Sequence, residues 1–145
     1  MSVSLIRARA SPVAAMLEWP IMWLSHDAFA DLVANALDGL PSEVHAWMDN
    51  VDVVVDDWPT RAQSDHAGRG ARGTLLGLYE GVPLTERGTG YGMVAPDRIT
   101  VFRGPLLRMC RTEAEVRDEV RRTVVHELAH HFGIDDDRLD ALGAY

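Results

Sequence analysis

The spacing of apolar and polar residues changes along the chain, and each change predicts a different element. Helical spacing predicts a first helix over residues 27–38, with apolar positions Phe29, Leu32, Val33, Ala36 and Leu37. A shorter helical turn is expected over 42–48. Alternating, valine-rich residues predict a strand over 51–57, and short apolar runs predict two further strands over 75–79 and 99–102.

Two connections between these strands lack an apolar period. Residues 59–73 (PTRAQSDHAGRGARG) are expected to form a loop, and the glycine-rich residues 81–92 form another. The third strand is expected to stop at Gly104-Pro105.

The strongest helical signal comes after these strands. Thr112 and Glu115 have the spacing of a capping box, in which each side chain satisfies a free backbone N–H. The helix behind them is expected to run to Phe132, where Gly133 supplies the left-handed turn that commonly ends helices. A short segment over 135–142 follows. On a helical wheel, the apolar stripe of this helix is Val116, Val120, Val124, Leu128 and Phe132.

His126 and His130 lie on nearly the opposite face of that helix. They are four residues apart, so their imidazoles can meet one metal ion. Zinc takes such a pair with a third protein ligand and leaves its fourth position to water. Glu127 is rotated toward that water and can take its proton and pass it to a leaving amine. The sequence therefore predicts His126 and His130 as zinc ligands and Glu127 as general base.

The third ligand has to come from beyond the helix. Gly133 lets the backbone turn sharply after His130, and an acidic run follows within reach. In the spacing HExxHxxGxxD, a glycine-broken helix brings the eleventh position back to the metal. We therefore expect Asp136 to be the third ligand. The alternatives are Asp135, Asp137 and Asp140.

Length, net charge, hydropathy and cysteine content argue against several classes of function. The 145 residues suffice for one domain, and a net charge of −8 argues against binding to nucleic acid or to an anionic membrane. No apolar stretch approaches the roughly 20 residues of a membrane-spanning helix. The lone Cys110 excludes a disulfide within the chain, which favours the cytoplasm, and is expected to be an inert buried thiol. Residues 1–21 lack a regular period and are expected to be a mobile extension before one domain over 22–145.

The remaining histidines and aromatic residues receive structural interpretations. His131 is expected to pack or to face solvent, because its wheel position differs from that of the pair. We expect His26, His45 and His66 to be structural or exposed. Trp58 and Tyr79 are expected in the core.

Five stretches of the sequence carry a resemblance to a known family. They are ALDGLP (Ala36–Pro41), VVVDDWP (Val53–Pro59), LLGLYEGVPLTER (Leu75–Arg87), PDRITVFRGPL (Pro96–Leu106) and VVHELAHHFGIDDDRL (Val124–Leu139). With them the chain resembles the small bacterial zincin-like proteins described as possible zinc metallopeptidases. The resemblance covers about residues 22–143.

The resemblance implies an α+β fold, in which a small mixed β-sheet packs on the HExxH helix together with an N-terminal helix in a minimal zincin-like arrangement. It implies a zinc ion on His126, His130 and Asp136, with Glu127 as base. We expect one zinc ion per chain, and a peptide or an unfolded protein as the substrate. No Met follows Asp136, so the Met-turn of the metzincins is not expected.

Two other functions are compatible with the residues. One is a zinc hydrolase of a non-peptide amide, and the other is a noncatalytic, partner-binding protein whose metal is structural. An intact Glu127 argues against the second, because a structural site has no use for a general base.

Zincins commonly lay a peptide against an edge strand of the sheet, which makes residues 75–80 the candidate substrate edge. Gly77 is expected to leave room for another backbone to approach. The alternative is an interior strand, since the leucines could fill both faces of a covered sheet.

Overall fold

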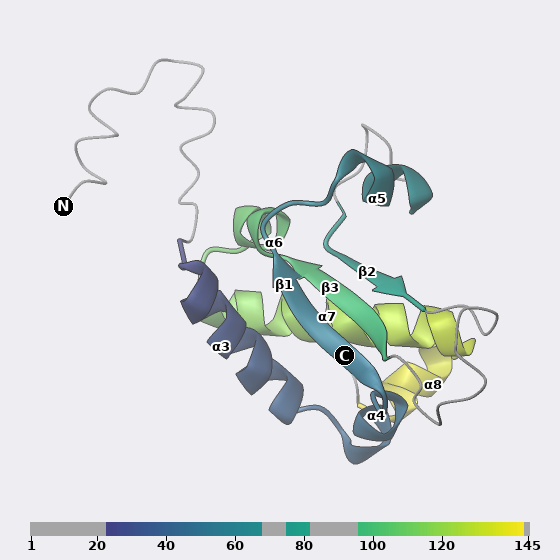
Figure 1. Cartoon of the computed structure of the whole chain (residues 1–145). Coiled ribbons are helices and arrows are strands. Elements are labelled where there is room, and N and C mark those ends of the chain that lie inside the picture. The colour runs from purple at the N-terminus through teal and green to yellow at the C-terminus, as the bar shows by residue number, and fades with distance from the viewer. Residues whose placement is uncertain (1–22, 68–74, 82–95, 144–145) are drawn as a thin grey trace, which may run out of the picture.

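The computed structural model describes residues 23–67, 75–81 and 96–143. The predicted extension over 1–21 lies outside these residues, as does most of the connection predicted over 81–92. In chain order the elements are α3 (His26–Asp38), α4 (Ser42–Trp47), β1 (Val51–Asp56), α5 (Arg61–His66), β2 (Gly77–Glu80), β3 (Asp97–Phe102), α6 (Arg103–Met109), α7 (Glu113–Phe132) and α8 (Asp136–Ala141) (Figure 1).

The strands form one mixed sheet in the order β1-β3-β2. β1 runs parallel to β3, with Val51 paired to Asp97, whereas β2 runs antiparallel to β3, with Gly77 paired to Val101. The long helix α7 contacts β2, β3 and α3 (Figure 1). This arrangement confirms the α+β class and the small mixed sheet on the HExxH helix.

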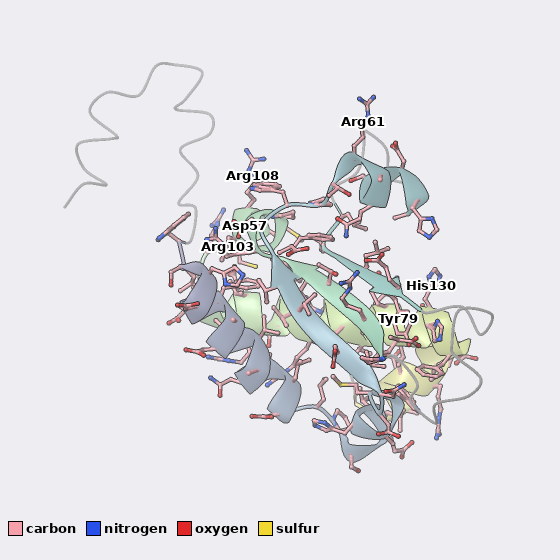
Figure 2. All side chains as sticks on the ribbon, in the orientation of Figure 1. Asp57, Arg61, Tyr79, Arg103, Arg108 and His130 are labelled. Carbon is pink, nitrogen blue, oxygen red and sulfur yellow. The ribbon has the colours of Figure 1, made fainter. Side chains whose placement is uncertain are left out.

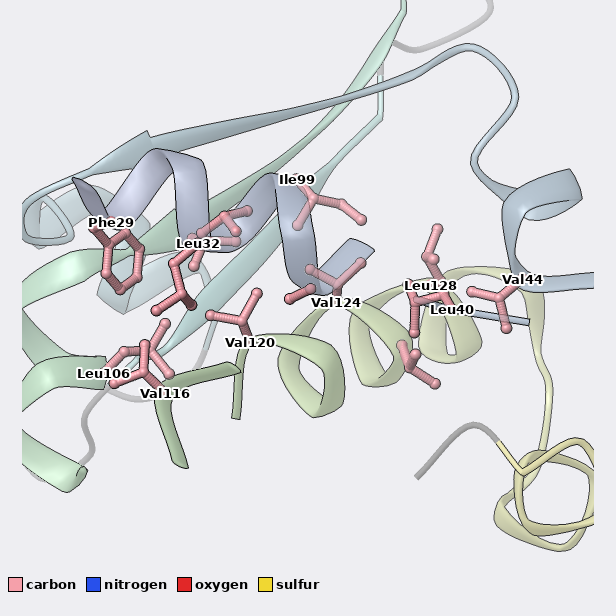
Figure 3. Packing of buried hydrophobic residues seen from close by; sticks show 14 of the residues in the cluster. Phe29, Leu32, Leu40, Val44, Ile99, Leu106, Val116, Val120, Val124 and Leu128 are labelled. Carbon is pink, nitrogen blue, oxygen red and sulfur yellow. The ribbon is translucent and has the colours of Figure 1, made fainter. Parts of the chain in front are cut away.

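The core lies along the predicted apolar stripe of α7. Val116, Val120, Val124 and Leu128 are fully buried. Figure 3 shows them in a row beside side chains of other elements, namely Phe29, Leu32, Ile99 and Leu106. Phe132, by contrast, is 47% exposed, so its place in the stripe was predicted wrongly. Residues four apart step about 40° around a helix, so Phe132 has rotated about 160° from Val116 and has left the core.

Both ends of α7 have the predicted local structure. The Thr112 hydroxyl accepts a hydrogen bond from the Glu115 N–H at 3.1 Å, and the Glu115 carboxylate accepts one from the Arg111 N–H at 2.7 Å. At the other end Gly133 has a φ of 68°, and its N–H donates to the Ala129 carbonyl oxygen. The turn that ends the metal-binding motif is therefore the left-handed one expected of glycine.

One short helix contradicts the sequence prediction, and another was not predicted. α5 lies within the segment predicted to be a loop, and none of its residues is buried, so it leaves no apolar period in the sequence. α6 follows β3 directly, with Gly104 and Pro105 inside its first turn. Proline is tolerated there because the first backbone N–H groups of a helix have no partner within it.

Trp58 is another correction. Its side chain was expected in the core but is 52% exposed. The indole lies against the backbone of Gly104, so closely that a Cβ on that glycine would overlap it, and the Arg108 guanidinium lies 5.5 Å from the ring centroid on the outside. In the described part of the chain, no helix is long and apolar enough to cross a bilayer.

Candidate metal centre

The two histidines of the HExxH motif lie together on the solvent-facing side of α7. Their ring centroids are 5.5 Å apart, with an angle of 25° between the ring planes. Both residues lie opposite the stripe that α7 buries in the core. One helical turn therefore places two imidazoles where they can share a ligand.

Glu127 lies half-buried between this pair and the sheet. Its Cγ is 4.0 Å from the point where a Cβ on Gly77 would be, which puts the carboxylate arm beneath β2. Residue 127 is thus held at the boundary between the solvent-facing side of α7 and the sheet.

A pocket of about 340 Å³ connects these residues with two other elements. Its lining residues are His66 and Ala67 at the end of α5, Leu75, Leu78, Tyr79 and Gly81 in and beside β2, and His126, Glu127, His130 and His131 on α7. The wall from α7 is polar and titratable, whereas Leu75 and Leu78 belong to a small apolar cluster with Phe102. The pocket therefore has a polar side formed by α7 and an apolar side formed by Leu75 and Leu78.

The proposed third ligand lies on the next helix. Asp136 is the first residue of α8 and is exposed. Asp135 is the N-cap of α8, and its carboxylate accepts a hydrogen bond from the Arg138 N–H at 2.9 Å, which leaves it less suited to be the ligand. Among residues 23–67, 75–81 and 96–143, no three His, Cys, Asp or Glu side chains are close enough together to hold an ion. Asp136 thus stays a prediction from the motif spacing.

The donor set of the pair fits zinc. No described residue shares a hydrogen bond with the His126 or His130 ring, so their nitrogens are available to a ligand. Neutral imidazoles four residues apart are typical zinc ligands, and an adjacent carboxylate that is not a ligand is typical of catalytic sites.

A second group of side chains closes the end of the pocket. Tyr79 donates a hydrogen bond from its hydroxyl to the Asp97 carboxylate at 2.6 Å, and its ring stacks on His131 with centroids 4.0 Å apart. Tyr79 and His130 lie at the same end of the molecule (Figure 2). Tyr79 packs against the core with partial exposure, and His131 packs on it, as predicted. This stack holds the last turn of α7 against β2.

Strand β2 is an edge of the sheet formed by the described residues, as predicted for the segment over 75–80. The reason given for Gly77 was wrong, however. A Cβ there would lie 2.5 Å from Thr123 Cγ2 and 3.2 Å from the Thr100 carbonyl oxygen, so the missing side chain lets β2 approach α7 and β3.

His66 is exposed, as expected, but sequence reasoning did not place it in the pocket that His126 and His130 line. It lies in a segment without an apolar period, and only the folded chain brings α5 toward α7. His26 and His45 are exposed and lie away from the pocket, as expected. Cys110 is buried, and burial raises the pKa of its thiol to about 11, which agrees with an inert residue.

Comparison with known proteins gives a family and a structural likeness. Among solved structures, a conserved hypothetical protein from Thermo thermophilus shares 20% identity with a TM-score of 0.48, over 75% of this chain and 94% of that one. The search of curated proteins found no match. The model of the zincin-like metallopeptidase family matches residues 48–144, which include every element from β1 to α8. The chain therefore belongs to the zincin-like metallopeptidase family.

Proposed function

We propose that the protein is a zinc-dependent peptidase. The observation that carries the proposal is the pocket itself: the HExxH residues of α7 form one wall, and the edge strand β2 forms another. A peptide bond held along β2 would lie beside the histidine pair and Glu127. Membership of the zincin-like metallopeptidases supports the same class of reaction.

His126 and His130 would hold the zinc ion, with Asp136 as the third protein ligand. When bound, zinc acts as a Lewis acid that lowers the pKa of water in its open position and polarises a carbonyl group. Glu127 accepts the proton of the attacking water and later gives it to the amine nitrogen as the C–N bond breaks. The position of Glu127, half-buried beside the histidine pair and beneath β2, suits this role.

The substrate would be a peptide or an unfolded protein. β2 is an edge of the sheet formed by the described residues and lines the pocket with Leu78 and Tyr79, and an extended chain can add to such an edge through backbone hydrogen bonds. These bonds do not depend on side chains, so the affinity would tolerate varied sequences. Leu75 and Leu78 would favour an apolar substrate side chain on that wall.

Zinc content and peptide turnover together test the proposal. Protein purified without chelator is expected to contain one zinc ion per chain and to cleave members of a mixed quenched-fluorescence peptide library. Glu127→Gln is expected to keep its zinc and to lose turnover by on the order of 10²–10⁴-fold.

Glu113→Gln is the matched control, because Glu113 lies at the exposed start of the same helix, away from the pocket. It is expected to retain full turnover. A wild-type protein that binds zinc and cleaves no peptide would contradict the proposal, and so would a Glu127→Gln variant as active as wild type.

A further inference from the structure

Helix α5 is held in position although its side chains are at most partly buried. It has six residues, and none of them is buried. A helix this short is not stable alone, because helices below about 12–15 residues are marginal in water. Its start nevertheless has a complete capping box: the Thr60 hydroxyl accepts from the Gln63 N–H at 3.1 Å, and the Gln63 side chain accepts from the Thr60 N–H at 2.9 Å.

The chain before α5 is anchored to α6. Trp58 lies on the Gly104 backbone, and the Gly104 N–H donates to the Asp57 carbonyl oxygen at 2.8 Å. Arg103 Nε donates to the Asp57 carboxylate, also at 2.8 Å, and Figure 2 shows these two side chains together at that end of the sheet. The end of α5 is anchored as well, since Ala67 packs against the apolar cluster that includes Leu75. Both ends of α5 are therefore fixed relative to the sheet.

This anchoring places His66 at the pocket. His66 is the last residue of α5, precedes the packed Ala67 and lines the pocket with His126, Glu127 and His130. Its ring makes no hydrogen bond or ion pair with any described residue, and its side chain is exposed. An imidazole that is held at this pocket, with no hydrogen bond or ion pair to the described residues, is available to a ligand.

We propose that His66 is a catalytic residue that stabilises the negative charge on the substrate oxygen, an inference that rests on the proposed peptidase function. Water oxygen bonds to the carbonyl carbon, its proton moves to Glu127, and the carbonyl π electrons move onto the carbonyl oxygen. The His66 N–H donates a hydrogen bond to that oxygen. The electron pair then returns, the C–N bond breaks, and the amine nitrogen takes the proton from Glu127. His66 keeps its proton throughout.

One observation favours this role over metal ligation. His66 belongs to the wall formed by α5, whereas the pair belongs to the wall formed by α7. From this separate wall of the pocket, His66 would contact the bound substrate and not the ion. Removing one such donor lowers turnover by on the order of 10²–10³-fold in other enzymes.

The test compares His66→Ala with His45→Ala, a matched control on the equally short helix α4, whose histidine is exposed and away from the pocket. Three quantities are measured on zinc-loaded protein: zinc affinity by chelator competition, kcat and KM for library peptides, and the dissociation constant of a phosphinic tripeptide with apolar side chains. The phosphinate carries a charged oxygen in place of the developing oxyanion.

His66→Ala is expected to keep its zinc affinity within about twofold, while kcat and phosphinate affinity each fall on the order of 10²-fold. His66→Gln, which keeps an N–H donor, is expected to recover part of both, and His45→Ala to match wild type. Unchanged kcat and phosphinate affinity in His66→Ala, beside an active wild type, would overturn the role of His66 alone. Loss of zinc from that variant would overturn it in favour of metal ligation. A wild type that neither cleaves peptides nor binds the phosphinate would overturn the peptidase proposal and this inference together.

Discussion

Thr123 lies directly under Gly77: a Cβ on residue 77 would be 2.5 Å from the Thr123 Cγ2 atom. Real Cβ atoms do not approach other atoms so closely, so the side chain of α7 and the backbone of β2 fit together only with glycine at this position. Because Glu127 lies one turn further along α7, this contact also fixes the distance between the edge strand and Glu127, the proposed general base.

Gly77→Ala is therefore expected to destabilise the protein by about 1–3 kcal/mol, as overpacked core substitutions do. Thr123→Ser removes the Cγ2 atom and keeps the hydroxyl, so the double variant is expected to recover much of the loss. Urea unfolding of the two single variants and the double variant gives the coupling energy between the positions. Additive effects would show that the contact does not limit the approach of β2.

Separate substitution of Asp136, Asp137 and Asp140 is expected to single out the third zinc ligand. Asp136→Ala should weaken zinc binding by at least about 10–100-fold, since the ion would lose a carboxylate. Asp137→Ala and Asp140→Ala, which remove equal charge from the same helix, should change it little. Zinc titration against a chelator measures each affinity. If Asp137→Ala loses the metal and Asp136→Ala keeps it, the assignment moves to the neighbouring residue.

The Cys110 thiol should not react in the folded protein near neutral pH. Burial, with smaller contributions from Glu119 and Glu115, raises its pKa from 9.0 to about 11. Between pH 9.0 and about 11 the thiol is protonated in the folded state and ionised in the unfolded state. The free energy of unfolding is therefore not reduced by this thiol below pH 9 and falls as the pH rises toward 11. At pH 8 a thiol reagent such as a disulfide dye should label the chain only after denaturant is added. Rapid labelling of the native protein would contradict this placement of the thiol.

The ion pair between Asp57 and Arg103 should stabilise the segment that leads from β1 into α5, except at acid pH. The hydrogen bond from Arg103, together with its charge, holds the pKa of the Asp57 carboxyl below its ordinary value of 3.8. Because the pKa of Asp57 is lower in the folded state, its carboxylate stabilises the fold in full above the unfolded-state pKa. This stabilisation is lost as the pH falls through the pKa of the folded state. Asp57→Asn should therefore lower the Tm at pH 7, and the difference from wild type should shrink below pH 3.8. An equal difference at neutral pH and in strong acid would mean that the charge on Asp57 contributes nothing.

The sequence predicts best what depends on neighbours along the chain. The helix that carries His126 and His130 could be recognised because its cap at Thr112, its i+4 spacing and its terminal Gly133 are all local signals. The same holds for β1, with its alternating valines. Phe132 was misplaced because a stripe of i+4 positions rotates around the helix, and the position at which it leaves the core depends on tertiary packing.

The other wall of the pocket depends on contacts between distant parts of the chain. α5 has no apolar face, and α6 begins with Gly104-Pro105, which usually ends an element, so neither was predicted. His66 could not be connected to His126 from the sequence, because their shared pocket depends on Trp58 lying against α6 and Ala67 lying against β2. The edge position of β2 was predicted, whereas the contact that Gly77 makes was not.

His126 and His130 lie on a single helix, and this has a consequence for the energetics of zinc. An ion that binds only the native state raises the free energy of unfolding by an amount set by the ratio of the free ion concentration to its dissociation constant. Here the two imidazoles are one helical turn apart, so a chain that has formed only part of α7 already presents both to the metal. Zinc would then bind partly folded chains as well, and the native protein would gain less thermal protection from zinc than its affinity alone implies.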